Sequence, residues 1–146
     1  MGAILALAVC GWTAMARAAV TNLVSPPVGP GQPLAVGVGL FISNLAAIHD
    51  QAQSFNVQGY LILRWRDPRL ANGEVVQARD QLLEGGWKPP VEFANAIAPV
   101  TILSSSLSAQ ADGSVLWIQR FDANLSTELW LRLFPFDRQH LEIALE

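Results

Sequence analysis

The sequence contains few of the residues on which most enzyme and metal chemistry depends. Its 146 residues include one cysteine, Cys10, and two histidines, His49 and His140, which are not spaced as a metal-binding pair. No glycine-rich phosphate loop precedes a helix pattern, and no serine lies in a nucleophile-elbow motif. These absences argue against an enzyme and against a bound metal or cofactor.

Charged residues are also scarce, at 14% of the sequence, whereas 51% of the residues are hydrophobic. Part of the apolar excess lies in residues 1–18, where a short apolar run is followed by Ala16-Arg17-Ala18, a small-x-small cleavage pattern. We expect residues 1–18 to be a secretory signal peptide, which would carry the chain across the inner membrane and remove Cys10. The alternative is a short membrane anchor, but the run is shorter than the roughly 20 apolar residues of a span.

The charge balance of the expected mature chain argues against nucleic acid as a partner. Removal of Arg17 from the nine basic residues leaves eight against twelve acidic ones, a net charge of −4. Nucleic-acid binding needs a basic face, so we expect no nucleic-acid partner. The next segment, residues 19–33, holds four prolines and two glycines and is expected to be a lead-in without regular structure.

Alternating apolar and polar residues predict an all-β domain over residues 34–146. Strands are expected at residues 34–45, 55–65, 91–95, 100–109, 114–125 and 140–146, and about two turns of helix at residues 75–86. Turn signals such as Asp67-Pro68 and Asp112-Gly113 separate them. The pattern is typical of an immunoglobulin-like antiparallel β-sandwich. We expect this sandwich to be incomplete, because the sequence stops within its last strand.

Three apolar residues interrupt the polar faces of these strands. Phe41 lies opposite the apolar stripe of residues 34–42, which we expect to face the core, and Tyr60 and Ile118 interrupt two other strands. Single exposed apolar residues are common and need no explanation. Alternatively, one face of the sandwich is a subunit interface with an aromatic ligand pocket, since aromatic residues concentrate in interfaces.

The segment LRLFPFDRQH, residues 131–140, combines two features that a strand or a plain surface loop avoids. Pro135 cannot donate a hydrogen bond to a sheet, and Phe134 and Phe136 would expose large apolar side chains in a loop. We therefore expect a loop whose apolar tip meets a partner surface.

Three motifs together resemble the extracellular ligand-binding domain of pentameric ligand-gated ion channels, the Cys-loop receptor superfamily. They are Trp65-x-Asp67-x-Arg69-Leu70, Trp87-x-Pro89 and Phe134-Pro135-Phe136-Asp137-x-Gln139. In animal members, cysteines flank the last motif at positions that Thr127 and Leu141 occupy here. This departure resembles the prokaryotic members, and the sequence looks most similar to their amine-gated, ELIC-like branch.

The resemblance implies a role for each of several residues. Phe41, Tyr60 and Ile118 would lie on the complementary face of a ligand site between identical subunits of a homopentamer, and Glu92 on the principal face. A small-molecule agonist, with a primary amine as the candidate, would bind there. Two positions depart from the pattern of the family: Ala94 lies where animal receptors carry an aromatic residue, and Ile118 lies where an amine-gated relative would carry a polar one.

The resemblance also implies coupling and structural residues. His49-Asp50 and the Phe134-Pro135-Phe136-Asp137 loop would contact a transmembrane domain beyond this sequence, on the extracellular or periplasmic side of a bacterial membrane. Trp65 would face the core, Asp67 would accept backbone N–H groups and fix the following turn, and Trp87 and Pro89 would shape the loop before Glu92. The alternative function is that of a soluble periplasmic or secreted β-sandwich that binds a ligand or partner.

Overall fold

The computed structural model describes residues 23–71, 85–129, 136 and 138–146. The expected signal peptide, the expected helix except for its last residues, and the side chains of Phe134, Pro135 and Asp137 lie outside the described residues. The described part contains four β-strands and one short 3₁₀ helix. They are β1 (Gly37–His49), β2 (Ser54–Arg66), η1 (Pro68–Leu70), β3 (Thr101–Ala109) and β4 (Ser114–Ser126).

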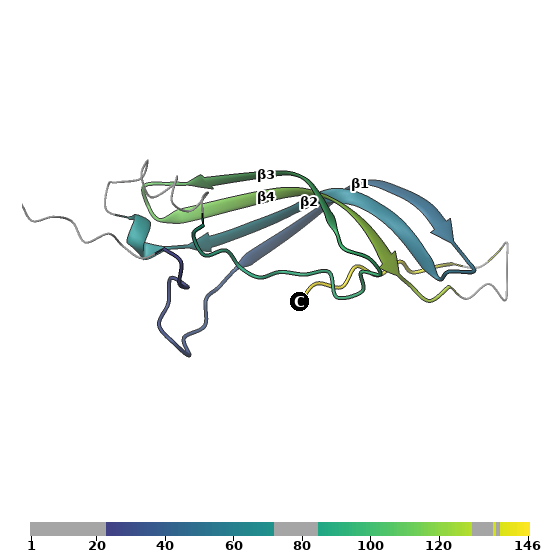
Figure 1. Ribbon diagram of the computed structural model, residues 1–146, viewed down its shortest axis with the longest axis horizontal. Coiled ribbons are helices and arrows are strands. Elements are labelled where there is room, and N and C mark those ends of the chain that lie inside the picture. The colour runs from purple at the N-terminus through teal and green to yellow at the C-terminus, as the bar shows by residue number, and fades with distance from the viewer. Residues whose placement is uncertain (1–22, 72–84, 130–135, 137) are drawn as a thin grey trace, which may run out of the picture.

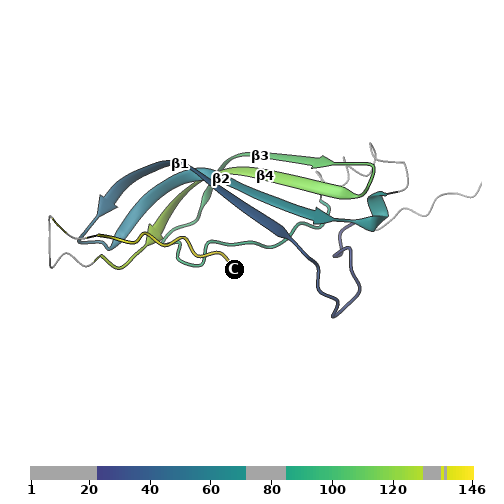
Figure 2. The same ribbon diagram turned by 180° about the vertical axis from the view of Figure 1, so that it is seen from behind.

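The strands form one antiparallel sheet in the order β1-β2-β4-β3, which is long and twisted (Figure 1). Residues 85–100 and 138–146 run along one face of this sheet as extended segments, as both ribbon views show (Figures 1 and 2). The prediction of an all-β, antiparallel fold of the sandwich type is confirmed. We call the covered side of the sheet its core face and the opposite side its outer face.

The core forms between the two central strands and the segments that cover them. Because side chains alternate between the faces of a strand, every second residue of β2 is buried, and the same face of β4 is buried at Val115, Phe121, Ala123 and Leu125 and half-buried at Trp117 and Gln119. The residues of β2 and β4 that are no more than 3% exposed are Phe55, Val57, Leu61, Leu63, Trp65, Val115, Phe121, Ala123 and Leu125. The period-two pattern of residues 55–65 and 114–125 therefore predicted both the strands and their buried faces.

Two predicted strands are not strands. Residues 91–95 and 140–146 run antiparallel, and the N–H groups of Glu92 and Glu146 donate to each other's carbonyl oxygens at 2.9 and 3.0 Å. Only isolated bridges form, Phe93 with Leu145 and Ala96 with Leu125. Prolines at positions 89, 90 and 99 cannot donate to a ladder, so the segment over residues 89–100 cannot pair continuously.

The first strand is an edge strand, and its apolar stripe is more exposed than expected. It begins at Gly37 rather than at residue 34 and continues to His49, so the connection to β2 is shorter than predicted. Val38, Leu40 and Ile42 point to the core side but are 51%, 38% and 39% exposed. In the described sheet β1 lies at the edge and pairs only with β2.

A glycine at the centre of β2 permits an irregularity in β1. The pairing of β1 with β2 shifts between Ile42 and Asn44, and Ser43 Oγ donates to the Gln58 carbonyl at 3.1 Å. A Cβ atom on Gly59 would overlap the carbonyl oxygen of Phe41 and lie 3.1 Å from Cζ of Phe121. The close approach of the β1 backbone therefore requires glycine at this position.

Candidate functional site

The outer face carries an aromatic pair made by neighbouring strands. The register of β1 and β2 sets Phe41 directly opposite Tyr60, with ring centroids 6.1 Å apart and an interplanar angle of 46°. The register of β2 and β4 sets Tyr60 opposite Arg120 and Ile62 opposite Ile118. Phe41, Tyr60 and Ile118, three of the four ligand residues predicted from the sequence, therefore lie on the same face of the sheet. Phe41 is 59% exposed there.

A polar cluster adjoins this aromatic pair on the outer face. Asn56 Nδ2 donates to Asp122 Oδ1 at 2.7 Å and to Asn124 Oδ1 at 3.1 Å. Gln58 Nε2 donates to the other Asp122 oxygen at 2.8 Å. Both oxygens of this carboxylate thus accept amide hydrogen bonds, which hold it beside the aromatic pair. We did not predict this cluster from the sequence. The polar residues that alternate with core residues in β2 and β4 could have indicated it.

Glu92, the fourth predicted ligand residue, lies on the opposite side of the sheet. It belongs to the segment that covers the core face, and its side chain is exposed. It lines a cavity of about 530 Å³ whose wall includes Trp117 and Gln119, core-face residues of β4. Because Ile118 between them points to the outer face, one chain cannot bring Glu92 and Tyr60 into the same pocket.

The cavity beside Glu92 is walled by ordered aromatic residues. Trp117 Nε1 donates to Ser105 Oγ at 2.8 Å, which fixes the indole against β3. Lys88 Nζ lies 5.9 Å from the centroid of the Trp117 ring, within cation–π range. Phe93 and Phe121 pack with ring centroids 4.7 Å apart. The cavity therefore presents an apolar wall with one carboxylate at its edge.

The predicted structural residues Trp65, Trp87 and Pro89 pack at the end of β2. Trp65 is 3% exposed and faces the core, and Trp87 meets it edge-on with ring centroids 6.2 Å apart. Pro89 is buried and contributes to the cavity wall beside Glu92. Among the described residues, Trp65 Nε1 has no hydrogen-bond partner.

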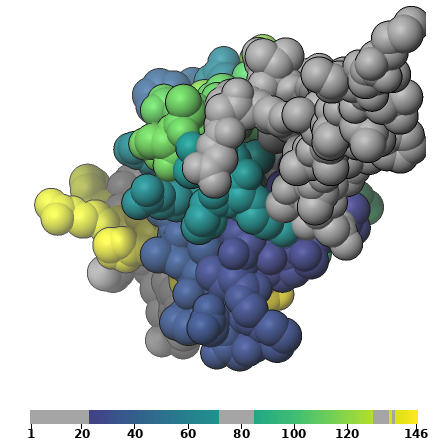
Figure 3. All heavy atoms as spheres, turned by 90° about the vertical axis from the view of Figure 1, so that its left-hand side faces the viewer, coloured from purple at the N-terminus to yellow at the C-terminus, as the bar shows by residue number. Residues whose placement is uncertain are grey.

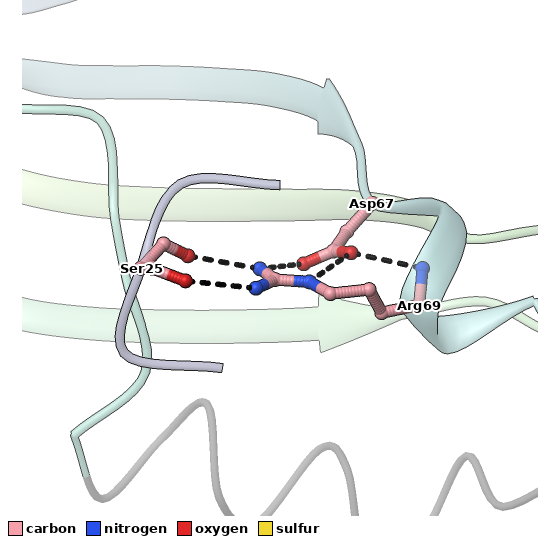
Figure 4. A network of polar contacts seen from close by, with 3 residues as sticks. All are labelled: Ser25, Asp67 and Arg69. Atoms are coloured by element: carbon pink, nitrogen blue, oxygen red, sulfur yellow. Dashed lines mark hydrogen bonds and ion pairs between the residues drawn. The ribbon is translucent and has the colours of Figure 1, made fainter. Parts of the chain in front are cut away.

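The carboxylate of Asp67 lies at the centre of a network of polar contacts with Arg69 (Figure 4). Its carboxylate is 1% exposed and accepts from the backbone N–H of Arg69 at 3.0 Å, from Nε at 2.9 Å and from Nη2 at 2.7 Å. Its own N–H donates to the Gly113 carbonyl at 2.8 Å. Sequence reasoning expected the backbone bonds but missed the ion pair with Arg69, although the Asp-x-Arg spacing across a proline turn could have indicated it.

The same network fixes the N-terminal segment to the end of the sheet. Arg69 Nη2 donates to the Ser25 carbonyl at 3.0 Å, and the Trp87 N–H donates to the Leu23 carbonyl at 2.7 Å. Leu23 is 5% exposed and joins the core. Figure 3 shows this end of the molecule, where the purple N-terminal segment packs against teal residues of the chain. Residues 23–33 contain no helix or strand, but their first residues are docked on the fold.

The β3–β4 hairpin carries the one described group with a clear pKa shift. Ser114 donates from its N–H and from its hydroxyl to the two oxygens of Asp112, both at 2.9 Å. These two hydrogen bonds hold the pKa of Asp112 below its usual value. The shift is that of a stabilised turn and does not indicate a catalytic carboxylate.

The opposite end of the sheet, which we call the base, carries the predicted coupling residues that the structure describes. His49 ends β1, and Asp50 begins the turn to β2, with its carboxylate accepting from the Gln51 N–H at 2.8 Å. Phe136 is 90% exposed. An exposed phenylalanine in this loop fits the prediction of an apolar tip that meets another surface.

Two polar residues that sequence reasoning missed hold the base together. Asn95 Nδ2 donates to the carbonyls of Ser126 at 2.8 Å and Glu142 at 2.9 Å, and its Oδ1 accepts from the Ala144 N–H at 3.1 Å. Gln53 connects the β1–β2 turn with the chain that follows β4. The residues next to Asn95 and Gln53 in the sequence do not indicate either role, because most of the partners are backbone groups of distant segments.

Within the described part of the chain, no group of three or more histidine, cysteine, aspartate or glutamate side chains could hold a metal ion. Within the same residues, no helix has the length and apolar character to cross a membrane.

Comparison with known proteins gives consistent matches over nearly the whole chain. The family model for the neurotransmitter-gated ion-channel ligand binding domain matches residues 19–146. A "Proton-gated ion channel" of Gloeobacter violaceus is 33% identical over 128 residues, covering 85% of this chain and 36% of the relative. "Glycine receptor subunit beta" of Homo sapiens and of Rattus norvegicus is 32% identical over 126 residues, covering 80% of this chain and 25% of those proteins. The chain thus spans about a quarter to a third of the length of these relatives.

Proposed function

The chain belongs to the neurotransmitter-gated ion-channel ligand-binding domain family, and from this we propose that it binds an agonist between identical subunits of a channel and couples that binding to pore opening. The family is one of ion channels and not of enzymes. The pore lies in a part of the protein beyond this sequence. Residues 1–18 are proposed to be a removed signal peptide, 19–33 the lead-in and 34–146 part of the ligand-binding domain on the extracellular or periplasmic side of the membrane.

One observation carries this proposal. Phe41, Tyr60 and Ile118 share the outer face of the sheet, whereas Glu92 lies beyond its core face. A ligand that contacts both sets must therefore bind between two copies of the chain. Repeating that contact around a ring gives a heterologous, closed assembly, which is the arrangement of a homopentamer. The alternative of a soluble binding protein gives no reason for two such separated surfaces.

The chemistry of the two surfaces suits a small cation. The aromatic pair Phe41 and Tyr60 can contact a protonated amine through cation–π interactions, and the Glu92 carboxylate can pair with its charge. We therefore propose a primary amine as the agonist class and assign the chain to the amine-gated bacterial branch. Protons are the alternative stimulus, because one relative is a proton-gated channel of Gloeobacter violaceus.

The base of the domain is the proposed route to the gate. Phe136 is 90% exposed, and the turn at His49 and Asp50 lies at the end where the chain leaves β4. We propose that these residues, with Phe134, Pro135 and Asp137, contact the transmembrane domain. Agonist binding can open the pore only if the agonist binds the open arrangement more tightly than the closed one.

The proposal is tested by currents from the full-length gene product in a planar bilayer or oocyte membrane. Butylamine and stepwise acidification are applied separately to the wild type and to Tyr60→Ala and Glu92→Gln. We expect butylamine to evoke current, and each substitution to raise its half-maximal concentration about tenfold or more. Gln110→Ala, in the exposed β3–β4 hairpin, is the control and is expected to respond as the wild type. A full-length product that conducts under neither stimulus would contradict the proposal.

A further inference from the structure

A glutamine side chain joins the two coupling loops at the base. Gln53 Nε2 donates to the Asp50 carbonyl at 2.7 Å, within the β1–β2 turn. Its Oε1 accepts from the Leu129 N–H at 2.6 Å, 76 residues away in the sequence. Its backbone carbonyl accepts from the Thr127 N–H at 2.8 Å. One residue therefore bonds the turn after β1 to the segment that leads from β4 into the Phe-Pro-Phe loop.

The backbone of Gln53 has an unusual conformation. Its φ angle is 47°, in the left-handed region that residues other than glycine and asparagine rarely adopt. Such conformations persist only where surrounding contacts over-determine them, and they concentrate at functional sites. Here four hydrogen bonds supply these contacts. The Gln53 N–H and Nε2 both donate to the Asp50 carbonyl, and the Gln53 carbonyl and Oε1 accept from the N–H groups of Thr127 and Leu129. A short turn alone would favour glycine, which has no side chain, or asparagine, whose side chain is too short to span from Asp50 to Leu129.

We infer that Gln53 is a positioning residue for gating, which makes the β1–β2 turn and the loop after β4 move as one unit. The inference rests on the proposed function, since it concerns how binding reaches the pore. Both partners of the Gln53 side chain are backbone groups, so the connection does not depend on the identity of the side chains at Asp50 and Leu129. Without the side-chain bond to Leu129, the Gln53 backbone would hold this segment only at Thr127, and part of the binding energy would not reach the gate.

The best test variant is Gln53→Asn in the full-length channel. Asparagine tolerates the left-handed conformation and keeps the amide, but its side chain is one methylene shorter. It therefore removes the bridge to Leu129 with little change of turn geometry. Gln110→Asn is the matched control, because it makes the same chemical change at an exposed glutamine of the β3–β4 hairpin, at the end of the sheet opposite the base. Gln53→Glu is a second variant, which keeps the acceptor for the Leu129 N–H and loses the donor to the Asp50 carbonyl.

Two quantities are measured with butylamine: the dissociation constant by calorimetry on the purified channel and the half-maximal concentration for current. For Gln53→Asn we expect the half-maximal concentration to rise at least about fivefold with an unchanged dissociation constant. Gln110→Asn should match the wild type, and Gln53→Glu should lie between. If Gln53→Asn does not assemble, Gln53→Met decides, because it keeps the length of the side chain and loses both amide hydrogen bonds. A wild-type response from Gln53→Met overturns the inference.

Other outcomes separate the inference from the proposed function. A wild-type half-maximal concentration in Gln53→Asn overturns the inference and leaves the proposed function intact. An equal rise in the dissociation constant also overturns it, because Gln53 would then only support the binding site. If the wild-type channel gives no current with butylamine, the same comparison is made with acid-evoked current. Absence of both wild-type currents contradicts the proposed function itself.

Discussion

Substitution of Asp67 by alanine should destabilise the domain more than any other single change at its polar residues. The Asp67 carboxylate is 1% exposed and accepts three hydrogen bonds from Arg69, whose side chain is 18% exposed. Breaking a buried ion pair by removing one partner costs about 3–5 kcal/mol, because a charge is left without compensation. Arg69 keeps its bonds to Ser25 and some contact with water, so we expect the lower end, about 3 kcal/mol.

This loss can be measured as a shift in the midpoint of thermal unfolding. At about 2–4 °C for each kcal/mol in a protein of this size, Asp67→Ala should lower the midpoint by about 6–12 °C. The double variant Asp67→Ala/Arg69→Met should recover part of the loss, because it removes both charges. Asp50→Ala, at an exposed turn, is the control. A midpoint for Asp67→Ala within about 2 °C of the wild type would refute the reasoning.

Three further predictions concern the bulge, the hairpin and the base. Gly59→Ala should cost about 1–3 kcal/mol in thermal unfolding, because its Cβ would overlap the Phe41 carbonyl; wild-type stability would refute the close approach. The pKa of Asp112 is lower than its usual value of 3.8, so at pH values above 3.8 its hydrogen bonds to Ser114 stabilise the hairpin. This stabilisation is lost as the pH falls through the pKa of the folded state. The protection of the Ser114 N–H against exchange, taken relative to its intrinsic exchange rate at each pH, should fall over that range in the wild type but not in Asp112→Asn, and a pH-independent protection would count against it. Phe136→Ala should impair gating with little change in agonist affinity, since the side chain is 90% exposed at the base; a loss of affinity with normal gating would contradict this.

The sequence predicted the parts of the fold that depend on local periodicity. The alternation of residues 55–65 and 114–125 specified β2, β4 and their buried faces, and it also assigned Tyr60 and Ile118 to the outer face. The alternation of residues 34–45 assigned Phe41 to the same face. Two of these side chains meet because strand register sets Phe41 opposite Tyr60. Register depends on the bulge at residues 42–44, which the sequence pattern alone did not indicate.

The features that the sequence did not predict depend on distant partners. Residues 91–95 alternate as a strand does, but within the described residues they meet residues 142–146 and Ser126 through isolated bridges and single hydrogen bonds. The buried stripe expected on β1 is exposed because β1 lies at the sheet edge. Gln53 and Asn95 bond mainly to backbone groups of other segments, and a backbone group leaves no signal in the side-chain pattern.

The central claim is that one ligand site is built from two copies of the chain, and co-expression of two defective variants tests it most directly. Tyr60→Ala damages the outer-face half of the proposed site and Glu92→Gln the other half, so channels of either variant alone should respond poorly to butylamine. In mixed channels, some interfaces join an intact Tyr60 of one subunit to an intact Glu92 of its neighbour. The account predicts that co-expression restores a component of the current with wild-type sensitivity. If Tyr60 and Glu92 acted within one subunit, every subunit would carry a lesion, and the absence of any sensitive component would contradict the account.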